Sequence, residues 1–325
     1  MTWHGPGMIS WENFQQPAGV RTFSLTSNRQ LRKPWRVRAT LNEDGLTGIL
    51  PTDGDFSPSN MILAGMNREN MALSLDDSGT FEGTADDTLL SGQYFQSSLL
   101  SDEERYRTAL LNSVFHPKQN AEDEVFPQEP SVLFWDESDS QALQVDEKDI
   151  RRQRAVLVIY PLELFPPEAG RTFLIPPQLL AYRSVANSDG GIGSSYANLR
   201  RRWQPQETAS KTMLEFQIPD ACRPMFPESG ELKLLIRAGS RFVTILSGER
   251  NSMRPVAELK SPLGMQTISI PGELIQSTCQ QGHVLLEIQV SEINSEMKAE
   301  DMSGEQDDSW QIERALLTLT GQRKI

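Results

Sequence analysis

The sequence has few of the residues that most often build catalytic or metal sites. Among its 325 residues are only two cysteines, Cys222 and Cys279, and three histidines. The cysteines form no C-x-x-C pair, and the histidines show neither an H-E-x-x-H motif nor another metal-ligand spacing, so no zinc site is indicated. We expect the two thiols to be unpaired. The alternative is a disulfide between them, which would fit an extracytoplasmic domain.

Long apolar runs are also absent. The longest, residues 155–162, is far shorter than the roughly 20 residues that cross a bilayer as a helix. Residues 1–7 lack the basic and apolar regions of a signal peptide. A complete chain of this kind would be cytoplasmic. The other interpretation is that the sequence is the soluble, extracytoplasmic part of a longer protein whose membrane anchors lie outside it.

Positive charge is scarce, since 31 Lys and Arg stand against 44 Asp and Glu, a formal net charge of −13. Proteins that bind nucleic acid or anionic membranes gain affinity from the opposite balance, so neither is an expected partner. Two local basic clusters occur at residues 151–154 and 200–202. We interpret them as solvated faces, with a binding patch as the alternative.

Motifs for nucleotide binding and nucleophilic catalysis are missing too. The glycine cluster at residues 190–193 lacks the spacing and the β-α-β context of a dinucleotide loop, which indicates an exposed loop. Ser194 and Ser195 stand in no G-x-S-x-G motif. We therefore expect no enzymatic activity and no cofactor.

What the sequence does contain is a strand pattern, clearest between residues 231 and 320. Leu232, Leu234 and Ile236 point one way with Glu231, Lys233 and Arg237 opposite, and a similar alternation recurs at residues 284–291. Burial with a period of two is typical of a strand that packs one face on a second sheet. The predicted fold is all-β, with two antiparallel, jelly-roll-like β-sandwich domains and one short helix.

The predicted organisation has four parts. Residues 1–20 form an extended arm, 21–115 an N-terminal sandwich, 116–130 an acidic linker and 131–325 the C-terminal sandwich. The helix spans residues 102–114, because Ser101 and Glu104 form a capping box before it.

Finer expectations concern four stretches of the C-terminal part. Residues 155–160 are apolar on both faces, which predicts a central strand covered on both sides. Residues 271–276 are expected to form one helical turn and residues 296–308 an acidic loop, and a bulge is expected near residues 313–314.

Three aromatic residues are candidate ligand-binding positions. Tyr196, Trp203 and Trp310 would serve a carbohydrate site if their rings were exposed and coplanar. For Trp310, which opens a strand with alternating apolar residues, core packing is the favoured interpretation.

One acidic cluster is a candidate calcium site. Asp301, Glu305, Asp307 and Asp308 offer loop carboxylates, the ligands that this hard cation prefers. The competing interpretation, which we favour, is a solvated loop.

Several segments resemble a known class of protein. They are residues 61–67 and the stretch to Tyr94, and residues 171–182, 199–203, 214–219, 232–245, 261–264 and 310–313. In order and texture they are similar to the β-rich extracytoplasmic parts of large, uncharacterised bacterial membrane-anchored proteins. The resemblance implies no activity and no catalytic residue. It does imply that anchors lie on flanking sequence.

The function that we expect is that of a non-catalytic extracytoplasmic or surface module for spacing or for contact with a protein partner. The first alternative is a carbohydrate-binding jelly roll. The second is a hydrolase that uses loop carboxylates, which would need a pocket with two acids of divergent pKa.

Overall fold

The computed structural model describes residues 2–3, 9–10, 36–50, 57–90, 92–95, 101–115, 127–136, 156–187, 195–300 and 308–324. The chain divides into two units, Met1–Pro34 and Trp35–Ile325. In the first unit, β1 (Thr2–Trp3) pairs antiparallel with β2 (Ile9–Ser10). Most of the predicted arm lies outside the described residues.

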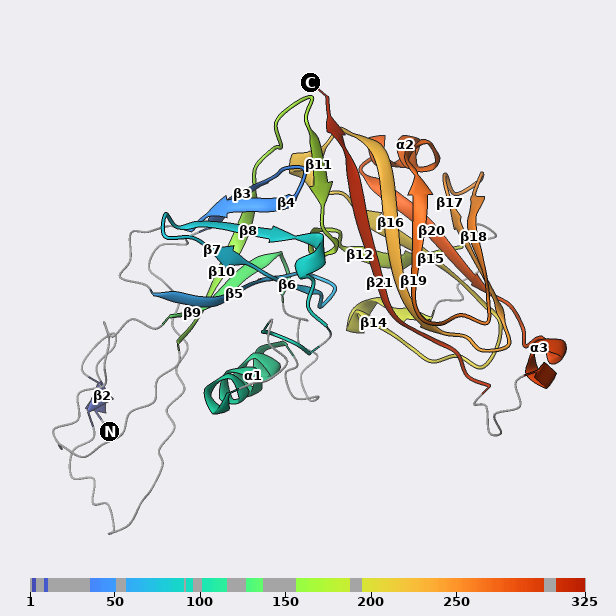
Figure 1. Ribbon diagram of the computed structural model, residues 1–325, viewed down its shortest axis with the longest axis horizontal. Coiled ribbons are helices and arrows are strands. Elements are labelled where there is room, and N and C mark those ends of the chain that lie inside the picture. Colours follow the sequence, from blue (N-terminus) through green and yellow to red (C-terminus); the bar gives the residue numbers. More distant parts are fainter. Residues whose placement is uncertain are drawn as a thin grey trace, which may run out of the picture. The chain divides into compact units, whose positions relative to one another are not determined.

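The prediction of an all-β fold is confirmed (Figure 1). All strand pairs in the described residues are antiparallel except that of β10 with β3. The described part of the chain has three α-helices rather than one: α1 (Asp102–Phe115), α2 (Gly272–Gln280) and α3 (Ser295–Glu300). None of them is long and apolar enough to cross a membrane.

The N-terminal half forms one sheet with the strand order β6-β5-β9-β10-β3-β4-β8-β7. Its strands are β3 (Val37–Leu41), β4 (Gly45–Ile49), β5 (Pro58–Ala64), β6 (Asn70–Ala72), β7 (Ser74–Leu75), β8 (Thr80–Thr84), β9 (Ser131–Asp136) and β10 (Val156–Leu164). β6 pairs with β5 at one end of this order, and β7 pairs with β8 at the other end. In the chain only Leu73 separates β6 from β7, so the two ends of the sheet meet. The sheet is therefore closed on itself.

Closure gives this sheet an inner and an outer face, and both are apolar around β9. Val132 and Phe134 join the inner core with Phe81. Leu133 and Trp135 point to the outer face, where they pack in a second cluster that includes residues of α1. The continuous run of buried side chains along β9 is the sequence signature of burial on two sides.

The outer cluster is covered by α1, which begins as predicted and ends one residue later. Glu104 N–H donates to Ser101 Oγ (3.2 Å) and Ser101 N–H donates to the Glu104 carboxylate (2.8 Å), so the capping box is confirmed. These hydrogen bonds lower the pKa of Glu104. The guanidinium of Arg107 lies 5.3 Å from the centre of the Trp135 ring.

The predicted domain boundary at residue 131 is wrong for β9 and β10. β10 pairs antiparallel with β9 and parallel with β3, with Leu162 opposite Val37. Both strands thus belong to the N-terminal sheet, because their hydrogen-bonding partners lie there. β10 is central, as expected, and its inner face is buried at Val158 and Tyr160. Within the described residues its outer face is covered only in part, since Leu157 packs against the outer cluster whereas Ile159 is 36% exposed.

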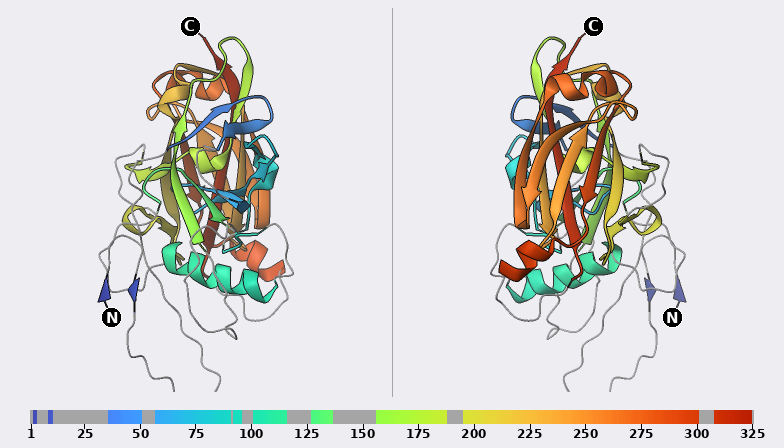
Figure 2. Two further views of the ribbon diagram at one scale, coloured as in Figure 1. Left: turned by 90° about the vertical axis from the view of Figure 1, so that its left-hand side faces the viewer. Right: turned by 90° about the vertical axis from the view of Figure 1, so that its right-hand side faces the viewer.

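The C-terminal half is a two-sheet sandwich (Figure 2). One sheet has the order β11-β21-β16-β19 and the other β12-β15-β20-β17-β18. Their bounds are β11 (Thr172–Ile175), β12 (Tyr182–Val185), β15 (Ser210–Gln217), β16 (Met225–Arg237), β17 (Phe242–Ser247), β18 (Arg254–Lys260), β19 (Leu263–Pro271), β20 (His283–Val290) and β21 (Gln311–Arg323). Between β12 and β15 in the sequence, β13 (Tyr196–Ala197) and β14 (Arg202–Trp203) pair as a two-stranded ribbon. The 3-10 helices are η1 (Ala85–Asp87), η2 (Pro177–Leu179), η3 (Asn198–Arg200) and η4 (Asp220–Cys222).

The alternating pattern of β16 produces the core of this sandwich, as predicted. Leu232, Leu234 and Ile236 are fully buried, while the side chains between them are not. The bulge is confirmed as well. Ile236 pairs with Ile312 but Leu235 pairs with Arg314, so β21 has one extra residue at Glu313.

Two helices are longer than expected or were not expected. α2 extends the single turn expected at residues 271–276 to nine residues. α3 (Ser295–Glu300) occupies the start of the stretch predicted as an acidic loop. Asn294 Oδ1 caps it by accepting hydrogen bonds from the N–H groups of Glu296 (3.0 Å) and Met297 (3.1 Å).

Both cysteines are unpaired and buried, as expected. Burial raises the pKa of Cys222 and of Cys279 to about 12. At pH 8 only about one thiol in ten thousand is then the reactive thiolate. We expect iodoacetamide to modify the folded protein very slowly at this pH and both thiols rapidly in denaturant, as counted by intact-mass spectrometry. Rapid modification of the folded chain would contradict this burial.

Candidate functional site

A pocket of about 450 Å³ lies where the closed sheet meets the sandwich. Residues 67–70, which lead into β6, form one side of it. β14 and the neighbouring ends of β16 and β21 form the other. The pocket is therefore built from segments that are far apart in the sequence.

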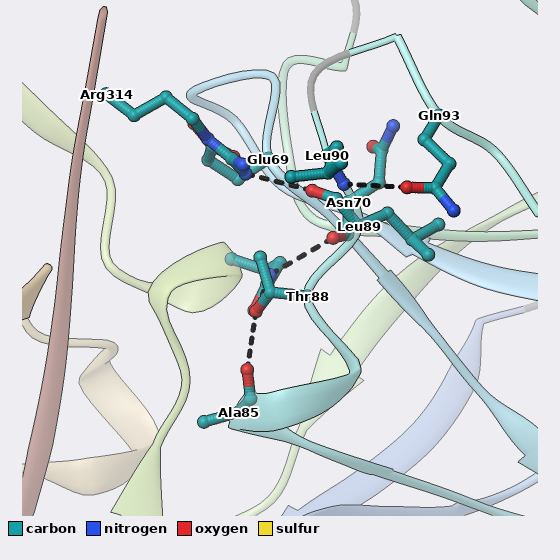
Figure 3. A network of polar contacts seen from close by, with 9 residues as sticks. Glu69, Asn70, Ala85, Thr88, Leu89, Leu90, Gln93 and Arg314 are labelled. Carbon is teal, nitrogen blue, oxygen red and sulfur yellow. Dashed lines mark hydrogen bonds and ion pairs between the residues drawn. The ribbon is translucent and has the colours of Figure 1, made fainter. Parts of the chain in front are cut away.

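A buried ion pair stands at this junction (Figure 3). The bulge in β21 places Glu313 and Arg314 in succession between the inward-facing Ile312 and Ala315, and so directs Arg314 away from the sandwich core. Its Nε donates to Glu69 Oε1 (3.2 Å), and a terminal nitrogen donates to the other Glu69 oxygen and to the Leu89 carbonyl (2.9 Å).

Burial decides the electrostatics of this pair. Glu69 and Arg314 are 7% and 6% exposed. Loss of hydration raises the pKa of Glu69 above its ordinary value, and the hydrogen bonds and positive charge of Arg314 oppose that rise. The guanidinium is thus what makes a buried carboxylate tolerable at the junction.

Neutral hydrogen bonds hold the same two parts together. Gln178 Nε2 donates to the Asn70 carbonyl (3.2 Å) and to Thr88 Oγ1 (3.0 Å). Asn67 Nδ2 donates to the Leu180 carbonyl (3.0 Å). Gly65 permits this approach, since a Cβ there would lie 2.7 Å from the Gln178 carbonyl oxygen. The walls of the pocket are fixed by these contacts.

Arginine dominates the charge of the pocket. Its lining includes Arg68, Arg201, Arg202, Arg237 and Arg314 against two glutamates, a formal balance of +3. This local excess stands out in a chain of net charge −13. Because concave, low-dielectric walls focus such a field, the pocket favours anions.

The two glutamates of the lining are each held by an arginine. Glu69 is paired with Arg314, and the Glu313 carboxylate lies 3.0 Å from Arg237 Nε. Arg201 is held differently, since it donates to the main-chain carbonyls of Met66 (2.6 Å) and Pro127 (2.8 Å). These carbonyls orient its guanidinium without neutralising its charge.

Two of the pocket arginines have a left-handed backbone. φ is 66° at Arg68 and 45° at Arg201, and they are two of five non-glycine residues with positive φ in the described part of the chain. Such a conformation costs about 1–2 kcal/mol for an L-residue. Backbone strain of this kind gathers at ligand sites, where surrounding contacts hold it.

An aromatic wall completes the pocket. Tyr182 and Trp203 line it, with ring centres 6.5 Å apart, and Tyr94 lines it from the closed-sheet side. Burial raises the pKa of Tyr182 well above its ordinary value and that of Tyr94 to about 12. These phenols are neutral at physiological pH.

The structure brings together two of the three predicted aromatic residues. Tyr196 and Trp203 are strand partners in the β13–β14 ribbon, with ring centres 5.1 Å apart, and they are 4% and 7% exposed. Trp310 is 1% exposed and does not line the pocket, and its Nε1 donates to the Thr208 carbonyl (2.8 Å). The exposed, coplanar arrangement that carbohydrate stacking needs is not found at these residues.

Most of the predicted calcium site lies outside the described residues, namely Asp301, Glu305 and Asp307. Asp308 is described, and its main-chain carbonyl accepts a hydrogen bond from Arg241 (3.0 Å). Among the residues that the structure describes, no group of three His, Cys, Asp or Glu side chains is placed to hold a metal ion. Calcium at this loop stays a prediction.

One part of the pocket lies in a run that the sequence marks as basic. Residues 200–202 were interpreted as a solvated face, with a binding patch as the alternative. Arg200 and Arg202 are exposed, and Arg201 and Arg202 line the pocket. The predicted bulge was the one local signal for Arg314. Residues 67–70 have the composition of an ordinary turn, so nothing local marked Arg68 or Glu69.

No family model matches this chain. No curated protein matches it either. Among solved structures it is similar to those of infectious bursal disease virus. The Gx strain is 14% identical over 87% of this chain and 71% of the other, with a TM-score of 0.19. The Gt strain is 15% identical over 88% and 76%, with a TM-score of 0.21. A likeness at these TM-scores carries no argument about fold or function.

Proposed function

We propose that this protein is a non-catalytic module for protein–protein contact, and that the contact is made by the edge strand β19. The observation that carries the proposal is that β19 is a nine-residue edge without a charged side chain. Edge strands display unpaired N–H and C=O groups, and proteins usually protect them against pairing with another chain.

The other three edges of the sandwich are protected. At β11, Leu174 N–H donates to the Asn42 carbonyl of the closed sheet (2.8 Å). At β12, Asn198 exchanges two hydrogen bonds with the main chain of Ser184. β18 has a proline, a register shift and three charged residues, the usual devices against pairing: Arg254, Pro255, Glu258 and Lys260.

β19 has none of these devices among its residues Leu263–Pro271 until its terminal proline. Within the described chain it pairs only with β16. Ile268 and Ile270 enter the core, while Leu263 and Met265 are 62% and 46% exposed. Strand addition at an open edge combines main-chain hydrogen bonds with side-chain contacts of this kind.

The partner that fits this edge is a second copy of the chain. Two identical strands can pair antiparallel about a two-fold axis, which makes the interface self-complementary. With a net charge of −13 two copies repel each other over much of their surface. An edge without charge lets them approach without placing like charges opposite each other.

The glutamates of the pocket argue against the hydrolase alternative. A hydrolase needs a carboxyl group that is available as acid, base or nucleophile, and both pocket glutamates are engaged by arginine. We retain an extracytoplasmic location and a membrane-anchored parent as part of the proposal, on the resemblance described above. Protein labelling from the outside of intact cells would test that location.

The contact is tested with Met265→Lys. Sedimentation equilibrium should show a dimer for the parent chain and a dissociation constant raised at least tenfold, about 1.4 kcal/mol, by the variant. The variant places one ammonium from each copy at the shared edge. Ile49→Lys is the matched control, because Ile49 is 63% exposed on β4, a strand paired on both sides.

Two outcomes would reject the proposal. One is a parent chain that stays monomeric at a concentration of about 100 µM, a range in which weak biological dimers are populated. The other is a dimer that Met265→Lys and Ile49→Lys affect equally. Circular dichroism of both variants checks that each retains its fold.

A further inference from the structure

We propose that the arginine-lined pocket binds a small molecule that carries at least two anionic oxygens, such as a phosphate ester or a polycarboxylate. This inference does not depend on the contact function proposed above, although the two places adjoin, because the pocket residue Arg237 pairs with Leu263 of β19.

The charged residues that line the pocket favour a multiply charged anion. Five arginines and two glutamates face a cavity of about 450 Å³. Guanidinium groups present paired N–H donors that match the oxygens of carboxylates and phosphates. A ligand with a single charge would leave most of the local +3 uncompensated, whereas a multiply charged one would offset it.

Two of the pocket arginines are held in place by the main chain. Arg201 is fixed by two main-chain carbonyls rather than by a carboxylate, so it is oriented and still fully charged. Arg68 and Arg201 both keep a left-handed backbone. Both conformations belong to turns, because the Arg201 N–H donates to the Asn198 carbonyl at the end of η3 and the Arg68 N–H donates to the Gly65 carbonyl. Prepositioned cations bind an anion with little loss of side-chain entropy.

The size and the walls limit the ligand. Sites for small molecules have volumes of about 300–1,000 Å³, so this pocket suits a metabolite-sized ligand rather than a nucleic-acid duplex. Tyr182 and Trp203 form part of the wall, but Trp203 is only 7% exposed, so the arginines provide the main contacts for a ligand.

Isothermal titration of the full chain in low-salt buffer tests this inference with three probes: citrate, pyrophosphate and inorganic phosphate. We expect one site per chain for citrate or pyrophosphate, and binding of either that weakens as salt is added. Citrate alone would indicate a carboxylate ligand, and pyrophosphate alone a phosphate ligand. Absence of binding by both at millimolar concentration would overturn the inference.

Arg202→Gln and Arg200→Gln form a matched pair, because each removes one charge from the same exposed run and only Arg202 lines the pocket. The first should weaken binding at least tenfold and the second less than twofold. Equal losses would mean diffuse surface attraction and would reject the site. Met265→Lys removes no pocket residue and adds a cation two residues from Leu263, the strand partner of Arg237, so it should not weaken binding of the probes. Failure of the β19 contact and failure of this pocket are therefore distinguishable.

Discussion

Replacing Arg314 with methionine is expected to lower the free energy of unfolding by about 3–5 kcal/mol at pH 7, the usual cost of removing one partner of a buried ion pair. The variant leaves the Glu69 carboxylate at the junction without its cation, and the Leu89 carbonyl without its donor. Both groups are then short of hydrogen bonds in a place that water reaches poorly.

The loss should depend on pH in a defined direction. The folded pKa of Glu69 already lies above its ordinary value of 4.5, and removal of Arg314 takes away the groups that restrain it. Below pH 4.5 the carboxyl group is protonated in both states, and the charge costs nothing. As pH rises, the unfolded chain ionises first, so stability falls until the folded pKa is passed. The deficit of Arg314→Met is therefore smallest in acid.

Urea unfolding between pH 4 and pH 8 measures this dependence. Arg237→Met is the control, since its pair with Glu313 is largely exposed and should contribute less than about 1 kcal/mol. A double variant with Glu69→Met and Arg314→Met should recover stability relative to Arg314→Met, because no buried charge remains. Equal, pH-independent losses in the two single variants would show that burial does not govern the pair.

The sandwich was predictable because its information is local. In β16 every second residue from Leu232 to Ile236 is apolar, and period-two burial fixes which face turns inward. The bulge at Glu313 was visible for the same reason, since the apolar set changes phase there. Where one face of a strand is exposed to solvent and the other is buried, the alternation of apolar and polar residues identifies the strand and its buried face.

The closed sheet depends on pairings that leave no local trace. β10 joins β3, more than a hundred residues earlier in the chain, and the intervening acidic stretch gives the composition of a linker. Closure requires one segment, residues 70–75, to pair with β5 through β6 and with β8 through β7, and only Leu73 separates the two strands. Composition and periodicity describe each strand but not its partner, so the boundary was placed too early.

The pocket shows the same limit at the level of side chains. Arg314 and Glu69 are 245 residues apart in sequence, and each in isolation is an ordinary surface residue type. The run at residues 200–202 was recognised as basic, but its role depends on what packs opposite. A cluster of charged residues is visible in a sequence. The pocket that such a cluster lines is not, because distant segments form it.

Replacing Trp310 with alanine is expected to lower the free energy of unfolding by about 3–5 kcal/mol, the range for truncation of a buried aromatic residue. The ring is 1% exposed, and its Nε1 donates to the Thr208 carbonyl (2.8 Å) beside the Gln206–Trp310 bridge. A tryptophan kept for stacking on a sugar would be exposed, and its truncation would change stability by less than about 0.5 kcal/mol.

Two further variants separate the contributions. Trp310→Phe keeps most of the buried ring and loses the hydrogen bond, so its loss should be about 1–3 kcal/mol from the unsatisfied carbonyl and the altered packing. Leu199→Ala is the control, because Leu199 is 94% exposed and should be nearly neutral. Chemical denaturation gives all three values. A Trp310→Ala protein as stable as Leu199→Ala would mean that this ring is not part of the core, and the carbohydrate hypothesis would regain its strongest residue.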